Sequence, residues 1–252
     1  MAVTIKSPQE IDKMRVAGQV LAEAIEMLKS MIKPGVNCLD LDKEFEKFIT
    51  EKGCKSNFKN YHGYPKTICV SINEQLVHGI PQDRILEEGD IVSVDTGCIY
   101  EGYHADSAFS MIVGIAKDKK HDILLKVTEE CLDLAIKALA PGVRIGTIGS
   151  IVQTHAESFG FGVPRDYTGH GIGTEMHEDP FIPNYGKKDT GMRLQAGMVI
   201  CIEPMIQMGT YKTKLAADNW TVLSADKSMA AHFEHTILIT DSGYEVLTKS
   251  KR

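Results

Sequence analysis

Apolar residues recur every three or four positions near the start of the chain. Between Ile11 and Leu28 they follow helical spacing. The stretch SPQE at 7–10 has the composition of a helix N-terminus, with a serine cap, a proline in the first turn and a glutamate three residues after the cap. The stretch KPG at 33–35 ends this helix. A second helix is expected over about residues 40–51.

The second half of the chain repeats this order. Helices are expected over about residues 121–139 and 147–159. The tripeptide Pro-Gly-Val at 34–36 recurs 107 residues further on, and the same offset relates Leu41 to Ile148 and Gly53 to Gly160. We therefore expect one domain spanning residues 1–252, built from two similar halves at roughly 1–115 and 116–252.

Strand patterns separate the helices. Alternating or β-branched apolar runs lie at 67–72, 90–95, 103–113, 198–203 and 231–240. Helices grouped apart from mostly antiparallel strands indicate an α+β fold rather than a βαβ winding.

Two of these runs form a predicted hairpin over 91–114, with Glu101-Gly102 at its turn. This register places Gly97 opposite Asp106. Asp95 is then the diagonal neighbour of Asp106 on the same sheet face, so the two carboxylates can converge.

Composition excludes several classes of protein. Of the 252 residues, 43% are apolar and 25% charged, as in a soluble globular protein. The net charge of −6 argues against general affinity for nucleic acid or for an anionic membrane. The N-terminus lacks the apolar core of a signal peptide, and no apolar run approaches the ~20 residues of a membrane span, so a cytoplasmic protein is expected. The six cysteines show no C-x-x-C pair, and we expect them to be reduced and buried.

Acidic side chains interrupt several of the apolar strands. Asp95 and Asp106 do so in the hairpin, Glu203 ends one strand, and Glu234 lies inside another with His232 on its face. Acids on a solvated face are the ordinary alternative. Because buried unpaired carboxylates are very costly, several of them together favour bound cations. With a histidine, such a set suits two divalent ions such as Mn²⁺, Fe²⁺ or Co²⁺ better than a tetrahedral structural zinc.

A glycine-rich loop, DYTGHGIGTEMHEDP at 166–180, holds two histidines, His170 and His177, and one of them would complete this set. Glycine at every second position disfavours regular structure and indicates an unusual backbone conformation or close backbone packing. An isolated histidine is more often an ordinary hydrogen-bonded residue, but the acids reverse that expectation.

Five segments make the chain resemble the bacterial type I methionine aminopeptidases, members of the pita-bread metallopeptidase family. The resemblance covers nearly the whole chain, and the segments that carry it are YHGYPKTICVSINEQLVHGIP, VDTGCIYEGYHADSA, GHGIGTEMHEDP, LQAGMVICIEPM and DNWTVLSADKSMAAHFEHTI. The resemblance implies the pita-bread fold, in which two pseudo-symmetric halves form a mostly antiparallel curved sheet covered by helices.

The resemblance also implies roles for individual residues. The metal ligands would be Asp95, Asp106, His170, Glu203 and Glu234, with Asp106 and Glu234 bridging two ions. Zn²⁺ and Ni²⁺ are further candidates beside Mn²⁺, Fe²⁺ and Co²⁺. A metal-bridging hydroxide would attack the scissile carbonyl, with catalytic roles for His78, His177 and Glu203. The substrate-binding set would be His78, His177, Tyr61, Tyr64, Cys69, Met176, Trp220 and Phe58.

The implied activity is removal of the initiator methionine from nascent proteins and peptides, with preference for a small second residue. We expect a monomer without direct nucleic-acid specificity or membrane attachment, and the ribosome is a candidate partner. Two positions depart from the family, since His232 stands where many relatives have Gln and Phe58 where some have a small residue.

Three other functions compete with this one. A proline-directed peptidase of the same fold would use the same metals but usually carries an extra N-terminal domain. A metal-free relative that binds protein or RNA would not need all five ligating residues. A two-metal phosphatase would need basic residues near the motifs, and the P-loop pattern is absent.

Overall fold

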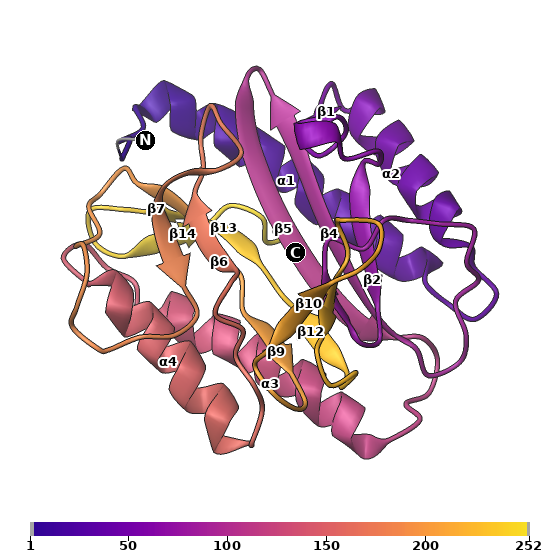
Figure 1. The fold of residues 1–252 in the computed structure, drawn as a ribbon. Coiled ribbons are helices and arrows are strands. Elements are labelled where there is room, and N and C mark those ends of the chain that lie inside the picture. The colour runs from indigo at the N-terminus through magenta and orange to yellow at the C-terminus, as the bar shows by residue number, and fades with distance from the viewer. Residues whose placement is uncertain (1–2, 251–252) are drawn as a thin grey trace.

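The computed structural model describes residues 3–250, and its first helix begins at the predicted cap. Helix α1 (Pro8–Met31) has Ser7 as its N-cap. The Ser7 hydroxyl accepts a hydrogen bond from the Glu10 amide, and the Glu10 carboxylate accepts one from the Ser7 amide at 2.7 Å, which completes the capping box. The helix lies behind the long β4–β5 hairpin and packs against it (Figure 1).

The other helices confirm the internal repeat. They are α2 (Cys38–Glu51), α3 (Lys119–Lys137) and α4 (Ile145–Ser158). The bounds of α2 and α4 are related by the same 107-residue offset as the sequence motifs. Gly35 and Gly142 precede them with φ of 92° and 88°, a left-handed conformation that favours glycine. The Gly35 amide donates to Leu86 O and the Gly142 amide to Leu194 O, so the two loops share their anchoring as well.

All strand pairings among the described residues are antiparallel, as expected for this α+β fold. One sheet joins β1, β4, β2 and β5, and another has the order β14-β13-β8-β6-β7. Two smaller sheets are β10-β11-β3 and β12-β9. The strands are β1 (Lys55–Ser56), β2 (Ile68–Ile72), β3 (Gln75–Val77), β4 (Ile91–Tyr100), β5 (Tyr103–Ile112), β6 (Thr168–Gly171), β7 (Glu178–Pro183), β8 (Val199–Ile202), β9 (Met205–Gln207), β10 (Thr213–Leu215), β11 (Val222–Ser224), β12 (Ala230–His232), β13 (His235–Ile239) and β14 (Tyr244–Val246).

The central hairpin has the predicted register. Tyr100 pairs with Tyr103, and Gly97 faces Asp106. Asp95 pairs with Ala108 and is therefore the diagonal neighbour of Asp106.

Two local predictions were wrong. The run at 231–240 is not one strand, because β12 ends at His232 and β13 begins at His235, so Glu234 lies between strands rather than inside one. His170 lies in strand β6 rather than in a loop. Both segments still pair through their backbones, and for Glu234 the partner is Ala108 of β5, which accepts its amide hydrogen at 2.9 Å.

The two halves meet along a seam, where Glu234 of the second half pairs with Ala108 of the first. The Asp106 amide donates to the Thr236 hydroxyl at 2.9 Å, and this hydroxyl donates to Asp106 O at 2.7 Å. One apolar core lies under α1 and α2 and another under α3 and α4. Phe233 packs against both. Hydrogen bonds and apolar packing therefore join the halves where acidic residues from both meet.

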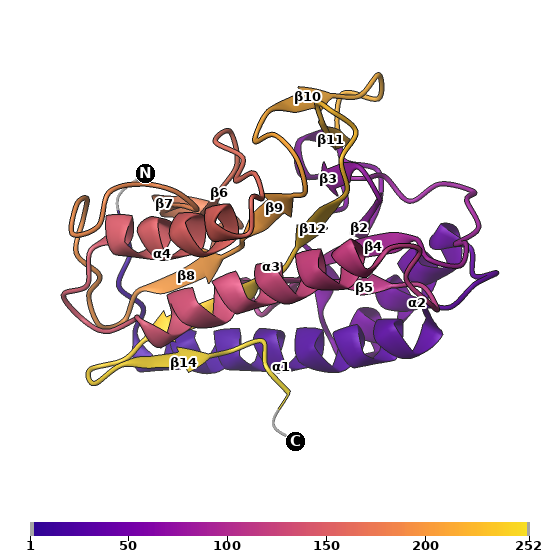
Figure 2. The ribbon, with the colours of Figure 1, turned by 90° about the horizontal axis from the view of Figure 1, so that it is seen from below.

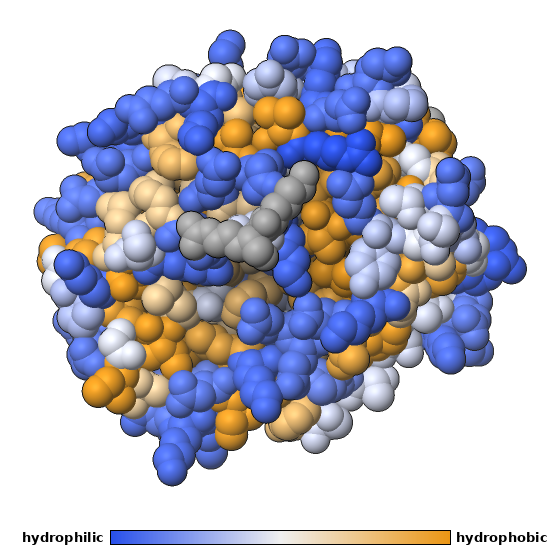
Figure 3. All heavy atoms as spheres, turned by 180° about the vertical axis from the view of Figure 1, so that it is seen from behind, coloured by the Kyte–Doolittle hydropathy of each residue, from blue (hydrophilic) through white to orange (hydrophobic). Residues whose placement is uncertain are grey.

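Helix α1 runs along one side of the strands while β10 and β11 project from the opposite side (Figure 2). The face behind that of Figure 1 is mainly hydrophilic, with apolar side chains scattered over it (Figure 3). No helix within residues 3–250 is long and apolar enough to cross a bilayer. All six cysteines are buried and free, as predicted.

Candidate metal centre and substrate pocket

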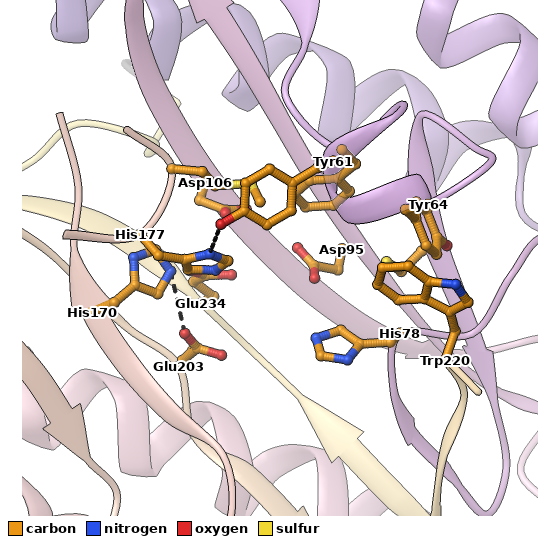
Figure 4. A pocket seen from close by; sticks show the side chains of 13 residues that line it. Tyr61, Tyr64, His78, Asp95, Asp106, His170, His177, Glu203, Trp220 and Glu234 are labelled. Carbon is orange, nitrogen blue, oxygen red and sulfur yellow. Dashed lines mark hydrogen bonds and ion pairs between the residues drawn. The ribbon is translucent and has the colours of Figure 1, made fainter. Parts of the chain in front are cut away.

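A cavity of about 140 Å³ opens beside the seam. A cavity of about 150 Å³ accommodates a benzene-sized group, so this one suits a single amino-acid side chain. In Figure 4, His170, His177 and Glu203 lie toward one side of it and Tyr64 and Trp220 toward the other, with Tyr61 beside His177 and His78 near Trp220. All thirteen residues predicted from the sequence line it, namely Phe58, Tyr61, Tyr64, Cys69, His78, Asp95, Asp106, His170, Met176, His177, Glu203, Trp220 and Glu234.

Four carboxylates face one another in the cavity. The hairpin supplies Asp95 and Asp106, Glu203 follows β8, and Glu234 lies between β12 and β13. Asp106 and Glu234 are 4% and 2% exposed, so water cannot screen them. Burial raises the pKa of Asp106 well above its ordinary value, and the charge of Glu234 raises it further. Burial likewise raises the pKa of Glu203 and of Glu234 well above the usual range.

Three of these carboxylates, those of Asp95, Asp106 and Glu234, each have one buried oxygen that makes no hydrogen bond. Buried acceptors in folded proteins are normally satisfied, and charged ones at the highest cost when they are not. Divalent cations would satisfy these oxygens and neutralise their mutual repulsion, so the donor set fits metal ions.

His170 presents the correct nitrogen to this set. Its Nδ1 lies 2.8 Å from Gly171 O, a carbonyl that only accepts, so Nδ1 carries the hydrogen and Nε2 is left with its lone pair. Nε2 lies 3.6 Å from a Glu203 oxygen. Burial lowers the pKa of His170 to about 3, so the imidazole stays neutral at physiological pH, as a metal ligand must.

The donor residues form three groups, and within each group the donor atoms lie within 4.8 Å of one another. Glu234 belongs to all three groups. One contains Asp95 and Asp106. A second contains His170 and Cys201, and a third contains Glu203 and His232. The sequence reasoning did not select Cys201, because it lies in a uniformly apolar strand and nothing in that pattern distinguishes its thiol from a core residue.

His177 lies at the exposed mouth of the cavity. The Tyr61 hydroxyl is 2.8 Å from His177 Nδ1 (Figure 4). Burial raises the pKa of Tyr61, so its hydroxyl stays protonated and can donate to Nδ1. In that arrangement His177 Nε2 carries a hydrogen that is free to reach a substrate oxygen.

His78 lies on the other side of the acids with a positive φ of 59°, an uncommon conformation for a residue with a side chain. Burial lowers its pKa to about 4, which leaves it neutral. The structure therefore brings His78 and His177 to opposite sides of the predicted ligands, as Figure 4 shows.

The apolar end of the cavity is built mainly from the first half. Phe58, Tyr64, Cys69 and Met176 form one buried cluster. Trp220 packs against it, with its ring at 5.1 Å and nearly perpendicular to that of Tyr64. Ile80 also packs there and was not predicted, since one more isoleucine in an apolar stretch carries no distinguishing signal.

Comparison with known proteins identifies the family of the chain. The profile of metallopeptidase family M24 matches residues 12–241. The chain belongs to metallopeptidase family M24. It is 70% identical to a methionine aminopeptidase of Mycoplasma capricolum over 250 residues, which is 99% of this chain and 100% of that protein. The crystal structure of a Thermotoga maritima methionine aminopeptidase superposes with a TM-score of 0.97 at 45% identity, covering 99% of this chain and 100% of that one.

Prolidase from Pyrococcus furiosus has the same fold but is less similar. Its TM-score is 0.79 and its identity 26%, and the match covers 98% of this chain but 66% of the prolidase. Within its family, the chain is therefore more similar to these methionine aminopeptidases than to this prolidase. The pita-bread fold expected from the sequence is confirmed.

Gly169 and Gly171 lie where strand β6 packs closely against its neighbours. A Cβ added at Gly169 would lie 2.3 Å from Cys201 O, and one at Gly171 would lie 2.2 Å from Asp179 O. Both distances are far below van der Waals contact, so β6 packs against β8 and β7 too closely for any side chain. Neither glycine has a positive φ, so the expectation of close backbone packing is confirmed here and unusual φ is not the reason.

A buried ion pair supports the segment that carries His177. Lys6 Nζ lies 2.7 Å from Glu178 Oε2, with side chains 5% and 4% exposed, and the Thr4 hydroxyl donates to the same oxygen at 2.6 Å. Burial alone would raise the pKa of Glu178, but the hydrogen bonds from Lys6 and Thr4 outweigh it and hold the pKa below its usual value. The other oxygen accepts the Glu175 amide at 3.3 Å. The sequence contains no signal for this pair, because Lys6 and Glu178 are 172 residues apart.

Proposed function

We propose that this chain removes the N-terminal methionine from peptides and nascent proteins, preferring a small second residue. The observation that carries the proposal is a side-chain-sized apolar cavity that ends directly at a cluster of buried acids and imidazoles. Its 70% identity to a named methionine aminopeptidase supports the same activity. Action as a monomer in the cytoplasm, on chains emerging from the ribosome, is part of this proposal, with residues 1–252 as one catalytic domain.

The residues that would hold two divalent ions of the Mn²⁺, Fe²⁺ or Co²⁺ type are Asp95, Asp106, His170, Glu203 and Glu234. When bound, such ions lower the pKa of water and polarise a carbonyl. The structure supports this assignment through the unpartnered buried carboxylate oxygens and the neutral His170 with its free Nε2.

The remaining steps are assigned to side chains around the acids. Glu203 takes the proton of the attacking water at a carboxylate oxygen and passes it to the leaving amine. His177 donates its Nε2 hydrogen to the oxygen that becomes negative, and Tyr61 holds the ring in that tautomer. His78 binds the scissile amide from the opposite side. In other enzymes, removing one donor to the developing negative oxygen, the role assigned here to His177, lowers the rate by about 10²–10³.

Methionine selectivity is assigned to the apolar end of the cavity. A thioether gains about 0.3–1.5 kcal/mol from contact with an aromatic ring, and Tyr61, Tyr64 and Trp220 offer such rings. Phe58, Cys69 and Met176 line the rest of this apolar end. Cys69 pairs with Asp95 across the sheet, so the pocket places the substrate's first residue beside the acids.

The proposal is tested by methionine release from Met-Ala-Ser by chelator-stripped protein, with and without Mn²⁺ or Co²⁺. We expect metal-dependent release of methionine and no release from Ala-Pro-Ser, the substrate type of a proline-directed peptidase. Met-Leu-Ser should be cleaved more slowly than Met-Ala-Ser if the second residue must be small. Failure to release methionine with any of the ions would contradict the proposal.

Stabilisation by the metal should depend on pH. In the metal-free protein, the raised pKa values of Asp106, Glu203 and Glu234 mean that folding takes up protons, a contribution present at low pH and lost as pH rises through those values. Ions must displace the protons that remain. His170, with its pKa of about 3, is neutral throughout and adds nothing to this dependence.

We therefore expect the rise in melting temperature on adding Mn²⁺ to be larger at about pH 7.5 than at about pH 5.5. Differential scanning calorimetry of stripped and loaded protein at both pH values measures it. An equal rise at both would show that the acids are ionised without metal.

A further inference from the structure

His232 is held rigidly beside the acids without belonging to the cavity wall. It ends β12 and pairs with Met205. Its amide donates to the Ser110 hydroxyl at 2.9 Å and its carbonyl accepts from that hydroxyl at 2.8 Å, so β5 fixes the backbone on both sides. The side chain is 2% exposed.

One imidazole nitrogen of His232 has no hydrogen-bond partner and faces two carboxylates. His232 Nε2 is buried and makes no hydrogen bond. It lies 3.6 Å from Glu203 Oε2 and 4.0 Å from Glu234 Oε2. A buried polar atom left unsatisfied is costly, so this geometry indicates a ligand between the three groups.

His170 and His232 can be judged by the same criterion, the distance between two donors that bind one ion. Nitrogen and oxygen donors bind these ions at about 2.0–2.2 Å, so two donors of one ion can be at most about 4.2 Å apart. His170 and Glu203 meet this limit at 3.6 Å, and so does His232 with both Glu203 and Glu234. The two carboxylate oxygens of Glu203 thus face one imidazole each.

We infer that His232 supplies a second imidazole nitrogen to the metal centre, a donor outside the five proposed ligands. The inference rests on the proposed metal-dependent function and deepens it. Because imidazole suits Co²⁺, Ni²⁺ and Zn²⁺ better than Mn²⁺, a second one shifts the preference of the centre toward those ions.

The competing role for His232 is that of a hydrogen-bond donor that only orients Glu203. Glutamine discriminates between the two, because its amide can donate to Glu203 but is a poor ligand for Co²⁺. His232→Gln therefore removes the metal donor while keeping a donor to the carboxylate. His235→Gln is the matched control, since His235 lies in the same segment but binds Thr248 through Nδ1 at 2.9 Å.

The measurement is the dissociation constant of chelator-stripped protein for Co²⁺ and Mn²⁺ by calorimetry, with the visible absorption of bound Co²⁺. For His232→Gln we expect Co²⁺ to bind about 10- to 100-fold more weakly and its absorption band to move, with Mn²⁺ affinity changed less than about threefold. His235→Gln should match the unmodified protein. Circular dichroism checks the fold of each variant.

Co²⁺ affinity and absorption in His232→Gln equal to those of the unmodified protein would overturn the inference while leaving the proposed function intact. Absence of any Co²⁺ or Mn²⁺ binding by the unmodified protein would overturn both. If His232→Gln does not fold, X-ray absorption of the Co²⁺-loaded unmodified protein decides. Scattering from two imidazoles per occupied centre supports the inference, and scattering from one rejects it.

Discussion

Glu234→Gln is expected to lower kcat/KM for Met-Ala-Ser by more than about 100-fold. Loss of a residue that merely supports a metal ligand costs about 10- to 100-fold in other proteins, and Glu234 is a member of all three donor groups. The same change removes one of several like charges that burial already disfavours. We therefore expect the metal-free variant to be at least as stable as the metal-free parent protein.

The opposite signs of these two effects make the test specific. Activity, Mn²⁺ affinity and the urea midpoint of stripped protein are measured together. Glu130→Gln, at a partly exposed position on α3 away from the cavity, serves as the control and should change none of them appreciably. A metal-free Glu234→Gln protein less stable than the parent would mean that Glu234 has a structural role and that its charge is not a burden.

Lys6→Met is expected to destabilise the protein by about 3–5 kcal/mol, because it leaves the carboxylate of Glu178 buried without its counter-ion. That is a large part of the about 5–15 kcal/mol that holds a typical domain together. Methionine keeps most of the volume of the lysine side chain, so the loss reports charge rather than packing. Urea denaturation measures it.

Two comparisons make this result interpretable. Lys59→Met removes a pair with Glu46 of similar length, 2.6 Å, but with both side chains 44% exposed, and should cost at most about 1 kcal/mol. Adding Glu178→Gln to Lys6→Met should recover part of the loss, since the uncompensated charge is then gone. Equal costs for the Lys6 and Lys59 changes would show that the buried pair is no stronger than a surface one.

The sequence predicted elements whose signal is local. The capping box of α1 depends on residues three apart, and the register of the β4–β5 hairpin follows from its turn at Glu101-Gly102. The repeat at an offset of 107 also predicted the bounds of α2 and α4 to within about two residues, because the same stop signals recur. The four acids of the cavity followed from the apolar strands that they interrupt, and the convergence of Asp95 and Asp106 followed from the hairpin register. The choice of His170 and the other eight residues of the cavity followed from the resemblance carried by five long segments.

Features that depend on distant contacts were not accessible in this way. The short strand β11 pairs with β10 nearby and with β3 far away in the chain, and three residues are too few to show a period. The break at Glu234 arises because this residue pairs with Ala108 of β5 while its neighbours pair elsewhere. Lys6 and Glu178 meet only through the tertiary fold, and neither position differs from a surface residue in its sequence context.

The seam between the halves also orders events during synthesis. A ribosome makes Asp95 and Asp106 early and Glu234 late, and Asp106 reaches its hydrogen-bond partner only when Thr236 has left the exit tunnel. Pairings between such distant positions form slowly, since a long loop must close first. The β4–β5 hairpin therefore gains its hydrogen bonds to the second half only after residue 236 has been translated. A chain that has not been extended past Glu234 consequently has no assembled set of donors.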